Sequence, residues 1–381
     1  MPQYKIRRVS APVDLAGETR ETEGVNLTIF GYPKTGKTTL FNLLSGAHVE
    51  VKAYEDGKRE ATQRTCPIPD SRLDRIAALY PDKKKINAVV ELFDLAGVSY
   101  GEVKNSIYLS ALRKADGLVH VVRGFVDPQI AHPRGIIRPR DDIHYMEEEL
   151  MLTDLISITA RMEKLEKDLR KAKSPEGEKE MELLTQFRAA LEEGKSIREL
   201  IFSPAEEKAV RSFTFLSQKP LLHLVNLDET DIPLIERPEE FYTARRPGTA
   251  VLAFCGKIES ELAELEGDEQ AGFMAEYGLK ELSPGRFFRA LPGLLQTISF
   301  FTIGKNEVRA WTVAAGSSAA QAAGAIHSDI EHGFIRAEVI SWSRLFELGS
   351  MQAAKDKGAV RLEGKDYSVQ DGDVIYFRFA A

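Results

Sequence analysis

The chain has 381 residues, of which 43% are hydrophobic and 29% are charged, so its composition is that of a soluble globular protein with two or three domains. Its formal net charge of −7 argues against a basic surface over the whole protein, and no apolar run reaches the roughly 18 residues that cross a bilayer. Two cysteines, Cys66 and Cys255, exclude a disulfide scaffold and form no zinc motif. We therefore expect a cytoplasmic protein that contacts no membrane and has no DNA-recognition motif.

Short apolar segments, each followed by polar or helical sequence, predict a mostly parallel α/β sheet covered on both faces. The predicted strands are residues 25–30, 89–93, 118–122, 221–225 and 250–254. Four of these five strands run directly into a polar or glycine-containing loop. Because ligands of such sheets sit beyond the carboxyl ends of the strands, we expect these loops to form a binding site.

The first predicted strand ends in a phosphate-binding motif, GxxxxGK[S/T]. It reads Gly31-Tyr32-Pro33-Lys34-Thr35-Gly36-Lys37-Thr38, and a predicted helix begins near Lys37. The glycines let backbone N–H groups point at phosphates, Lys37 reaches the β- and γ-phosphates, and the Thr38 hydroxyl binds Mg²⁺. We expect all eight residues and the adjacent Thr39 to contact a nucleoside triphosphate.

Asp94-Leu95-Ala96-Gly97 follows the second predicted strand and matches the DxxG motif of nucleotidases. Asp94 is expected to hold Mg²⁺ through water, and the Gly97 N–H is expected to meet the γ-phosphate. Positioning and charge neutralisation dominate phosphoryl transfer. We therefore expect Lys37, Thr38, Asp94 and Gly97 to be the catalytic residues.

The fourth and fifth predicted strands end in loops that are expected to hold the base. Asn226-Leu227-Asp228-Glu229 occupies the position where GTPases have Asn-Lys-x-Asp, and Cys255 with Gly256 is expected to back the base. Glu229 replaces the aspartate that accepts two guanine N–H groups, and this change argues against strict guanine selectivity. We expect Asn226, Leu227 and Glu229 to contact the nucleotide. His223, inside the fourth strand, is expected to be packed or hydrogen-bonded.

A charged segment between the third and fourth strands predicts an inserted antiparallel helical hairpin. Apolar residues with coiled-coil spacing occur at positions 155, 158, 162, 165 and 169. Residues 173–177 break this pattern, which resumes over 181–191. Ser203-Pro204-Ala205-Glu206 then has the sequence of a helix N-terminus and marks the return to the nucleotide domain.

The last part of the chain predicts a small β-grasp module with a binding role. Strands are expected at 308–313, 335–340 and 374–377, with a helix at 319–330. The expected domains are an N-terminal extension at 1–24, a nucleotide-binding domain in two parts at 25–135 and 203–297, a helical coiled-coil insertion at 136–202, and a C-terminal domain at 298–381.

Residues 25–381 resemble the YchF / Obg-like ATPase family of P-loop nucleotidases. The resemblance rests on motifs at 31–42, 69–74, 94–97, 120–123, 226–229, 307–312, 363–367 and 371–374. It implies that the C-terminal module is a TGS domain. It also implies ATP binding at least as good as GTP binding, slow hydrolysis, and association with the ribosome through ribosomal RNA or protein. Val98 matches the hydrophobic residue that follows DxxG in this family.

The chain departs from the family at three places. Lys34 replaces an asparagine that in related nucleotidases helps to hold a K⁺ ion, and we hypothesise that its ammonium group replaces that ion. The threonine of the first switch falls on Lys58, with Thr62 as the nearest candidate Mg²⁺ ligand. Residues 99–103 are shorter than the glycine-rich second switch. These changes predict a diverged paralogue.

The sequence thus leads to three hypotheses. The first is a Mg²⁺-dependent nucleotidase that slowly hydrolyses ATP and acts as a regulatory switch on the ribosome. The second is a nucleotide-gated binding protein with little or no hydrolysis, which the altered switches favour. The third is a GTPase, which requires Glu229 to recognise guanine.

Overall fold

The computed structural model describes residues 24–49, 61–99, 101–103, 106–244 and 246–380. The described chain forms two compact units. The nucleotide unit contains residues 26–64 and 92–287, and the C-terminal unit contains residues 65–91 and 288–380. The position of Lys58 lies outside the described residues, and so does most of the expected N-terminal extension. The domain boundaries expected from the sequence stay a prediction.

A six-stranded sheet forms the centre of the nucleotide unit, with the strand order β2-β4-β1-β5-β6-β7. Its strands are β1 (Val25–Phe30), β2 (Thr62–Pro67), β4 (Val89–Asp94), β5 (Gly117–Arg123), β6 (Leu221–Asn226) and β7 (Thr249–Phe254). The pairs β1–β5, β5–β6 and β6–β7 are parallel, and every residue of β5 and β6 is buried. All five predicted strands are confirmed. The sequence did not predict β2, because its segment Thr-Gln-Arg-Thr-Cys-Pro is largely polar.

The strands of this sheet alternate along the chain with helices and 3₁₀ turns. The helices are α1 (Lys37–Ser45), α3 (Ser106–Lys114), α6 (Pro204–Val210), α7 (Gly256–Leu262), α8 (Gly267–Glu276) and α9 (Ser283–Leu295), with 3₁₀ turns η1 (Ile197–Glu199), η2 (Arg211–Phe213), η3 (Leu216–Gln218), η4 (Glu229–Glu236) and η5 (Pro238–Glu240). One apolar cluster gathers around Phe30 and Leu118, and a second around Val225 and Ile258. The predicted N-terminus of α6 is confirmed, since Ser203 and Glu206 bond each other's backbone N–H groups.

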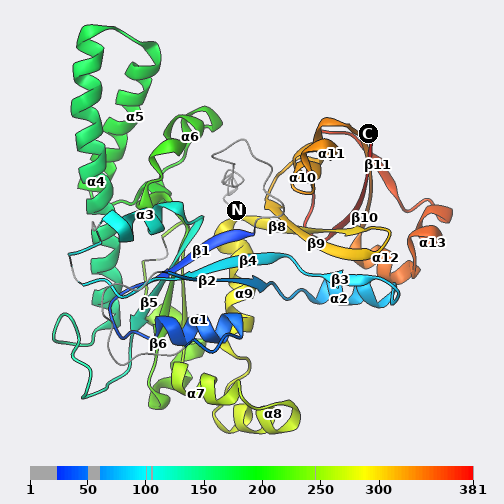
Figure 1. Cartoon of the computed structure of the whole chain (residues 1–381), viewed down its shortest axis with the longest axis horizontal. Coiled ribbons are helices and arrows are strands. Elements are labelled where there is room, and N and C mark those ends of the chain that lie inside the picture. The colour runs from blue at the N-terminus through cyan, green and yellow to red at the C-terminus, as the bar shows by residue number, and fades with distance from the viewer. Residues whose placement is uncertain (1–23, 50–60, 100, 104–105, 245, 381) are drawn as a thin grey trace, which may run out of the picture. The chain divides into compact units, whose positions relative to one another are not determined.

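The predicted helical hairpin is present as an arm made of α4 (Pro139–Lys171) and α5 (Pro175–Glu192), which extends beyond the sheet (Figure 1). Ile158 and Leu165 of α4 pack with Phe187 and other apolar side chains of α5. α5 begins at Pro175, earlier than the pattern predicted, because the Ser174 hydroxyl caps it by accepting a hydrogen bond from Gly177 N.

The C-terminal unit contains a second six-stranded sheet with the order β11-β10-β12-β8-β9-β3. Its elements are α2 (Ser71–Ala78), β3 (Lys84–Ile86), β8 (Thr297–Ile303), β9 (Glu307–Ala314), α10 (Ala319–Gly324), α11 (Ser328–His332), β10 (Phe334–Ser341), α12 (Trp342–Leu348), α13 (Met351–Asp356), β11 (Arg361–Glu363) and β12 (Asp373–Phe379). The predicted single helix at 319–330 is wrong. Extended backbone at His327, which caps α11, divides it into two short helices.

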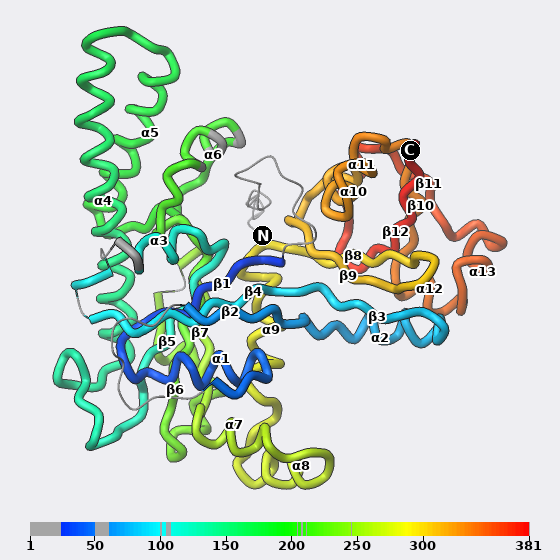
Figure 2. Tube along the Cα trace, viewed as in Figure 1, coloured from blue at the N-terminus to red at the C-terminus, as the bar shows by residue number. Residues whose placement is uncertain are grey.

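A segment distant in sequence completes this second sheet. β3 pairs in parallel with β9, and the two run side by side in Figure 2. Leu73 and Ile76 of α2 are fully buried against Phe301, Val308 and other apolar residues of the C-terminal unit. Residues 65–91 therefore supply part of the core of that unit. In the described part of the chain, no helix is long and apolar enough to span a bilayer.

Candidate nucleotide site

The loop between β1 and α1 has a backbone shape that only glycine accepts at two positions. Gly31 and Gly36 have φ values of 141° and 96°. A Cβ atom at Gly31 would lie 2.5 Å from Val121 O, and one at Gly36 would lie 2.2 Å from Asn226 Nδ2. Both the left-handed backbone and the close neighbours exclude a side chain. The GxxxxGK[S/T] spacing thus corresponds to a real constraint of this fold.

The side chains of Lys37 and Thr35 both form a hydrogen bond with the backbone of the same loop. Lys37 Nζ donates a hydrogen bond to Tyr32 O at 2.7 Å, and Thr35 Oγ1 donates to the same oxygen at 3.2 Å. The Lys37 side chain is buried, at the first position of α1. Its charge therefore stands beside the N-terminus of a helix, where the backbone also favours an anion.

Thr38 and Asp94 bring two oxygen donors together at the end of this loop. Thr38 Oγ1 donates a hydrogen bond to Asp94 Oδ2 at 2.8 Å, and Asp94 is only 3% exposed at the end of β4. Hydroxyl and carboxylate oxygens are the donors that Mg²⁺ prefers, and Mg²⁺ in such sites is completed by phosphates and water. The described residues contain no group of three or more His, Cys, Asp or Glu side chains that could hold a metal. Thr38 and Asp94 together offer two oxygen atoms of the kind that Mg²⁺ binds.

The DxxG segment is tied to the phosphate-binding loop through its backbone. Leu95 N donates to Ile29 O at 3.1 Å, and Val98 N donates to Gly31 O at 3.1 Å. Gly97 is thereby held between two residues anchored to the β1 end. Thr62 lies at the start of β2. Its role as a Mg²⁺ ligand stays a prediction.

Asn226 connects the two loops at the ends of β6 and β7 to the phosphate-binding loop. Asn226 Nδ2 donates to Thr35 O at 3.1 Å, and Asn226 Oδ1 accepts from Gly256 N at 2.9 Å. Leu227 N donates to Phe254 O, which continues the ladder beyond the strands. In this arrangement both polar atoms of the Asn226 side chain bond the protein's own backbone.

The other residues of the base loops differ in exposure. The Glu229 carboxylate forms an ion pair with the Lys257 ammonium group at the surface. Lys257 follows directly after the predicted pair Cys255 and Gly256. Cys255 is fully buried, and burial raises the pKa of its thiol, so it is a small packed side chain and not a nucleophile.

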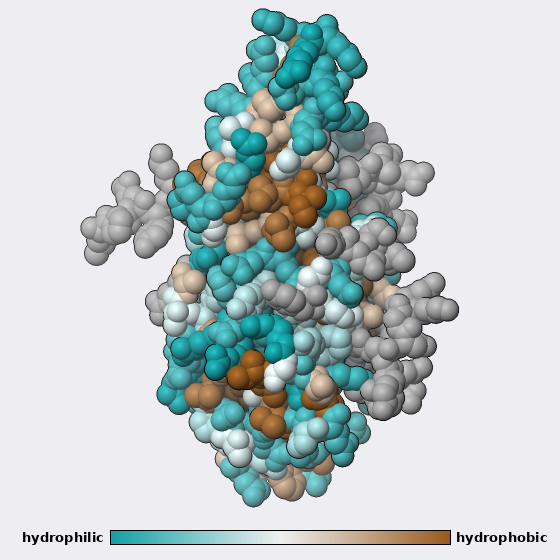
Figure 3. Space-filling model, turned by 90° about the vertical axis from the view of Figure 1, so that its left-hand side faces the viewer, coloured by the Kyte–Doolittle hydropathy of each residue, from teal (hydrophilic) through white to brown (hydrophobic). Residues whose placement is uncertain are grey.

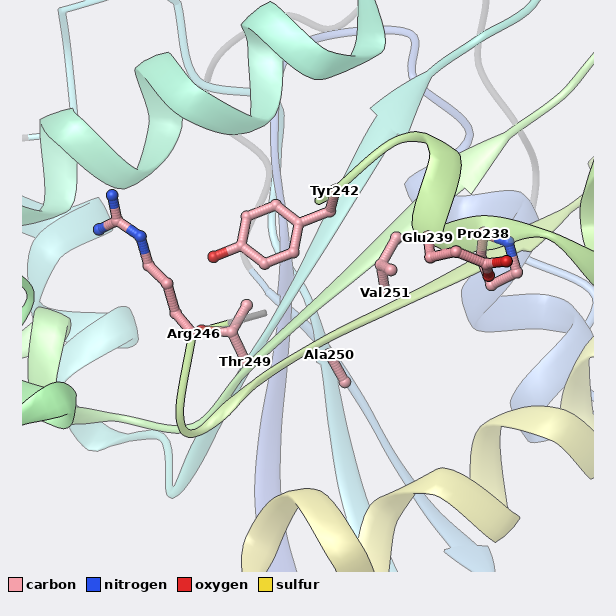
Figure 4. Close-up of a pocket in the computed structure, with 7 residues that line it drawn as sticks. All are labelled: Pro238, Glu239, Tyr242, Arg246, Thr249, Ala250 and Val251. Atoms are coloured by element: carbon pink, nitrogen blue, oxygen red, sulfur yellow. The ribbon is translucent and has the colours of Figure 1, made fainter. Parts of the chain in front are cut away.

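A separate pocket of about 280 Å³ opens beside the beginning of β7 (Figure 4). It is lined by Pro238, Glu239, Tyr242, Arg246, Thr249, Ala250 and Val251. The loop predicted to hold the base follows the other end of β7, at Cys255, so this pocket lies at the opposite end of that strand.

Two family models match the chain. Residues 26–159 match the family described as 50S ribosome-binding GTPase, and residues 297–380 match the YchF-GTPase C-terminal family, described as a protein of unknown function. The first match covers β1 to β5 and the first part of α4, and the second covers β8 to β12.

Curated relatives are similar over nearly their full length. The chain is 38% identical over 359 residues to the ribosome-binding ATPase YchF of Bacillus subtilis, with 92% of this chain and 98% of the relative covered. It is 32% identical over 391 residues to Obg-like ATPase 1 of Oryza sativa subsp. japonica, with 100% and 98% covered. The solved structure of the Schizosaccharomyces pombe YchF GTPase superposes with a TM-score of 0.77 at 25% identity, covering 94% of this chain and 99% of that one.

Proposed function

Because the chain belongs to the YchF / Obg-like ATPase family, we propose that it binds ATP with Mg²⁺, hydrolyses it slowly, and acts as a nucleotide-dependent switch on the ribosome. The observation that carries this proposal is the hydrogen bond between Thr38 and Asp94 beside the buried Lys37. A protein that used this fold only as a scaffold would have no need of all three groups.

Each residue of the site has a distinct part in this proposal. The backbone N–H groups of 31–38, apart from Pro33, would surround the phosphates, and Lys37 would neutralise charge on the β- and γ-phosphates. Thr38 would hold Mg²⁺ directly and Asp94 would hold it through water. Mg²⁺, when bound, neutralises charge on the phosphate oxygens. The Gly97 N–H would donate a hydrogen bond to the γ-phosphate.

Slow hydrolysis follows from what stands after the DxxG motif. Val98 is apolar, only 5% exposed, and bonded through its N–H to Gly31 O. A side chain of this kind does not orient an attacking water, which many GTPases achieve with a glutamine at this place. Turnover then depends on charge neutralisation by Lys37 and Mg²⁺, and on a partner that completes the site.

The base loops favour adenine over guanine in this proposal. Glu229 is paired with Lys257, so the carboxylate that would accept guanine N–H groups already holds a cation. Asn226 acts through the backbone of Thr35 and Gly256, with Leu227 and Cys255 as apolar neighbours of the base.

The arm offers a surface for a macromolecular partner. Leu152 and Ile156 lie one turn apart on α4 and are 56% and 53% exposed. Figure 3 shows the side of the molecule that carries the arm, where the tip is hydrophilic and apolar side chains gather below it. Exposed apolar groups in such a cluster favour contact with a partner, and we assign this role to the ribosome.

Two other functions have specific support. Val98 and the altered first switch favour a nucleotide-gated binding protein with little or no turnover. The Schizosaccharomyces pombe structure is titled a YchF GTPase, which favours GTP as an alternative substrate. Both alternatives keep the same phosphate and Mg²⁺ contacts.

The test is phosphate release from Mg-ATP and Mg-GTP, with and without purified ribosomes. We expect release from ATP that ribosomes increase and that Lys37→Ala abolishes. Lys280→Ala, which removes an exposed lysine of the same unit, is the matched control and should leave release unchanged. Tight ATP binding without release under any condition would refute hydrolysis and leave the nucleotide-gated binding protein. Faster release from GTP would support the GTPase.

A further inference from the structure

A chain of buried polar side chains crosses the apolar interior of the nucleotide unit. His120 of β5 and His223 of β6 lie opposite each other in the sheet, with their Nδ1 atoms 3.0 Å apart. His223 Nε2 lies 3.4 Å from Glu147 Oε1, and the Tyr242 hydroxyl donates to the same oxygen at 3.1 Å. The four residues are at most 8% exposed. Buried polar groups of this kind are costly unless they are bonded, so their arrangement is tightly constrained.

His120, at one end of this chain of polar side chains, reaches the phosphate-binding loop. The His120 ring packs against the Phe30 ring at 5.2 Å between centroids. A Cβ atom at Gly31 would lie 3.3 Å from His120 Cδ2, so this edge of the imidazole faces the start of the loop. Lys37 is close enough for its charge to lower the pKa of His120, in addition to the larger effect of burial.

Glu147, at the other end, lies in the first part of α4, which we call the root of the arm. This helix extends into the arm. Burial opposes the ionisation of Glu147, but its contact with His223 and the nearby charges of Arg198 and Arg246 outweigh this effect and lower its pKa. Glu147 is therefore a carboxylate that accepts hydrogen bonds from both His223 and Tyr242.

The proton positions follow from this carboxylate. Burial lowers the pKa of both histidines, so each ring is neutral and carries one N–H. His223 must place its proton on Nε2, toward Glu147, which leaves its Nδ1 as an acceptor. His120 must then donate from Nδ1, and its Nε2 carries a lone pair. Among the residues that the structure describes, none donates a hydrogen bond to His120 Nε2.

If α4 moved Glu147 away from His223, the reason for this proton arrangement would be lost. The reversed arrangement would put an N–H on His120 Nε2, at the edge of the ring that faces Gly31. Lys37 lies close enough for its charge to act on His120, and a positive charge favours a lone pair over an N–H on the ring edge that faces the loop. The polar side chains from His120 to Glu147 can thus adopt two proton arrangements whose balance depends on both ends, and coupling between two sites requires such a two-state element.

We propose that His120 and His223 are positioning residues that couple the root of the arm, through Glu147, to the phosphate-binding loop. Nucleotide phosphates that engage Lys37 change the charge near His120, and with it the balance between the arrangement in which α4 keeps Glu147 against His223 and the reversed arrangement. By reciprocity, a partner that shifts α4 changes nucleotide affinity. The proposal deepens the proposed function, and from it requires only that the chain bind a nucleotide.

The first test is hydrogen exchange of the unmodified full-length protein with and without a non-hydrolysable ATP analogue. We expect the exchange rate of α4 amides around residues 143–151 to change by about fivefold or more with the analogue bound, which is the lower end of typical coupling factors. Unchanged exchange in this segment, with protection of residues 31–40 as proof of binding, would overturn the proposal. Failure of hydrolysis alone would affect the proposed function and not this result.

The second test uses two variants that each change the size of one buried side chain only slightly. His223→Phe keeps a ring in the core but removes the contacts of residue 223 with His120 and with Glu147. Tyr242→Phe removes one hydrogen bond to Glu147 and keeps the contact between Glu147 and His223. We expect His223→Phe to lose the nucleotide-dependent change in exchange of α4 while still binding the analogue, with affinity altered about fivefold. Tyr242→Phe should retain this change in exchange. A purely structural role predicts that both variants lower the melting temperature and that both retain the change in exchange.

Discussion

Replacement of Asn226 by alanine should separate the phosphate-binding loop from the loop after β7. Asn226 is 6% exposed, and its amide bridges Thr35 O at 3.1 Å and Gly256 N at 2.9 Å. In Asn226→Ala both backbone groups lose their partner in a buried site. Each buried polar group left without a hydrogen bond costs about 1–3 kcal/mol. Since water can enter the space left by the amide, we expect the free energy of unfolding to fall by about 2–4 kcal/mol in total.

The same change should weaken nucleotide binding. The Thr35 carbonyl belongs to the loop that surrounds the phosphates, and without the Asn226 amide this loop has additional conformations. We expect the dissociation constant for Mg-ATP to rise about tenfold, which corresponds to about 1.4 kcal/mol. Urea unfolding followed by circular dichroism measures the first effect, and titration with a fluorescent ATP analogue measures the second.

Asn42→Ala is the matched control for this experiment. Asn42 makes the same pair of bonds to a single backbone residue, donating to Val49 O at 2.8 Å and accepting from Val49 N at 3.1 Å. It is half-buried and bonds no residue of the phosphate-binding loop, so water can replace its amide. We expect the free energy of unfolding to fall by about 1 kcal/mol and the affinity for ATP to stay unchanged. Equal effects of the two variants on affinity would refute the role assigned to Asn226.

The remaining predictions concern ions, base selectivity and pH. If the Lys34 ammonium group replaces the K⁺ ion, as we hypothesise, the unmodified protein should release phosphate from ATP at similar rates in K⁺ and Na⁺, and Lys34→Asn should release it several-fold faster in K⁺ than in Na⁺. Asparagine also tolerates the φ of 61° found at this position. Glu229→Asp should shift the ratio of ATP to GTP affinity toward GTP by about tenfold in competition binding, because a shorter carboxylate leaves Lys257 and can accept guanine N–H groups. Burial lowers the pKa of His120 and of His223, so the unfolded state takes up protons near pH 6.5 that the folded state does not. The free energy of unfolding should therefore fall as the pH drops below about 6.5, by at most about 1.4 kcal/mol per histidine per pH unit.

Each of these predictions has a result that contradicts it. A strong preference for K⁺ in the unmodified protein would show that Lys34 does not replace the ion. An unchanged affinity ratio in Glu229→Asp would mean that this side chain does not read the base. For the pH prediction, urea unfolding at pH 7.5 and 5.5 should show a smaller difference in His223→Phe than in the unmodified protein. Equal differences would mean that other groups carry the pH dependence.

The sequence by itself determined the parts of the fold that depend on local pattern. The strands β1, β5 and β6 are short segments rich in apolar residues, and the arm follows from apolar spacing over many residues of α4. The order of motifs placed Lys37, Thr38 and Asp94 in one site, because parallel strands end at the same edge of a sheet. The Thr38–Asp94 hydrogen bond agrees with this expectation.

Only the tertiary structure decided contacts between residues far apart in the chain. Asn226 bonds Thr35, which lies 191 positions away, and no local pattern could show that its amide bonds the backbone. The polar β2 and the short β3 form strands because neighbouring strands supply their hydrogen bonds, which overrides their weak local preference. Glu147 lies in no motif, and the motif at 120–123 assigned no role to His120. They meet through His223 because the register of β5 with β6 and the packing of α4 place them there, and such long-range geometry is set by the folded core as a whole.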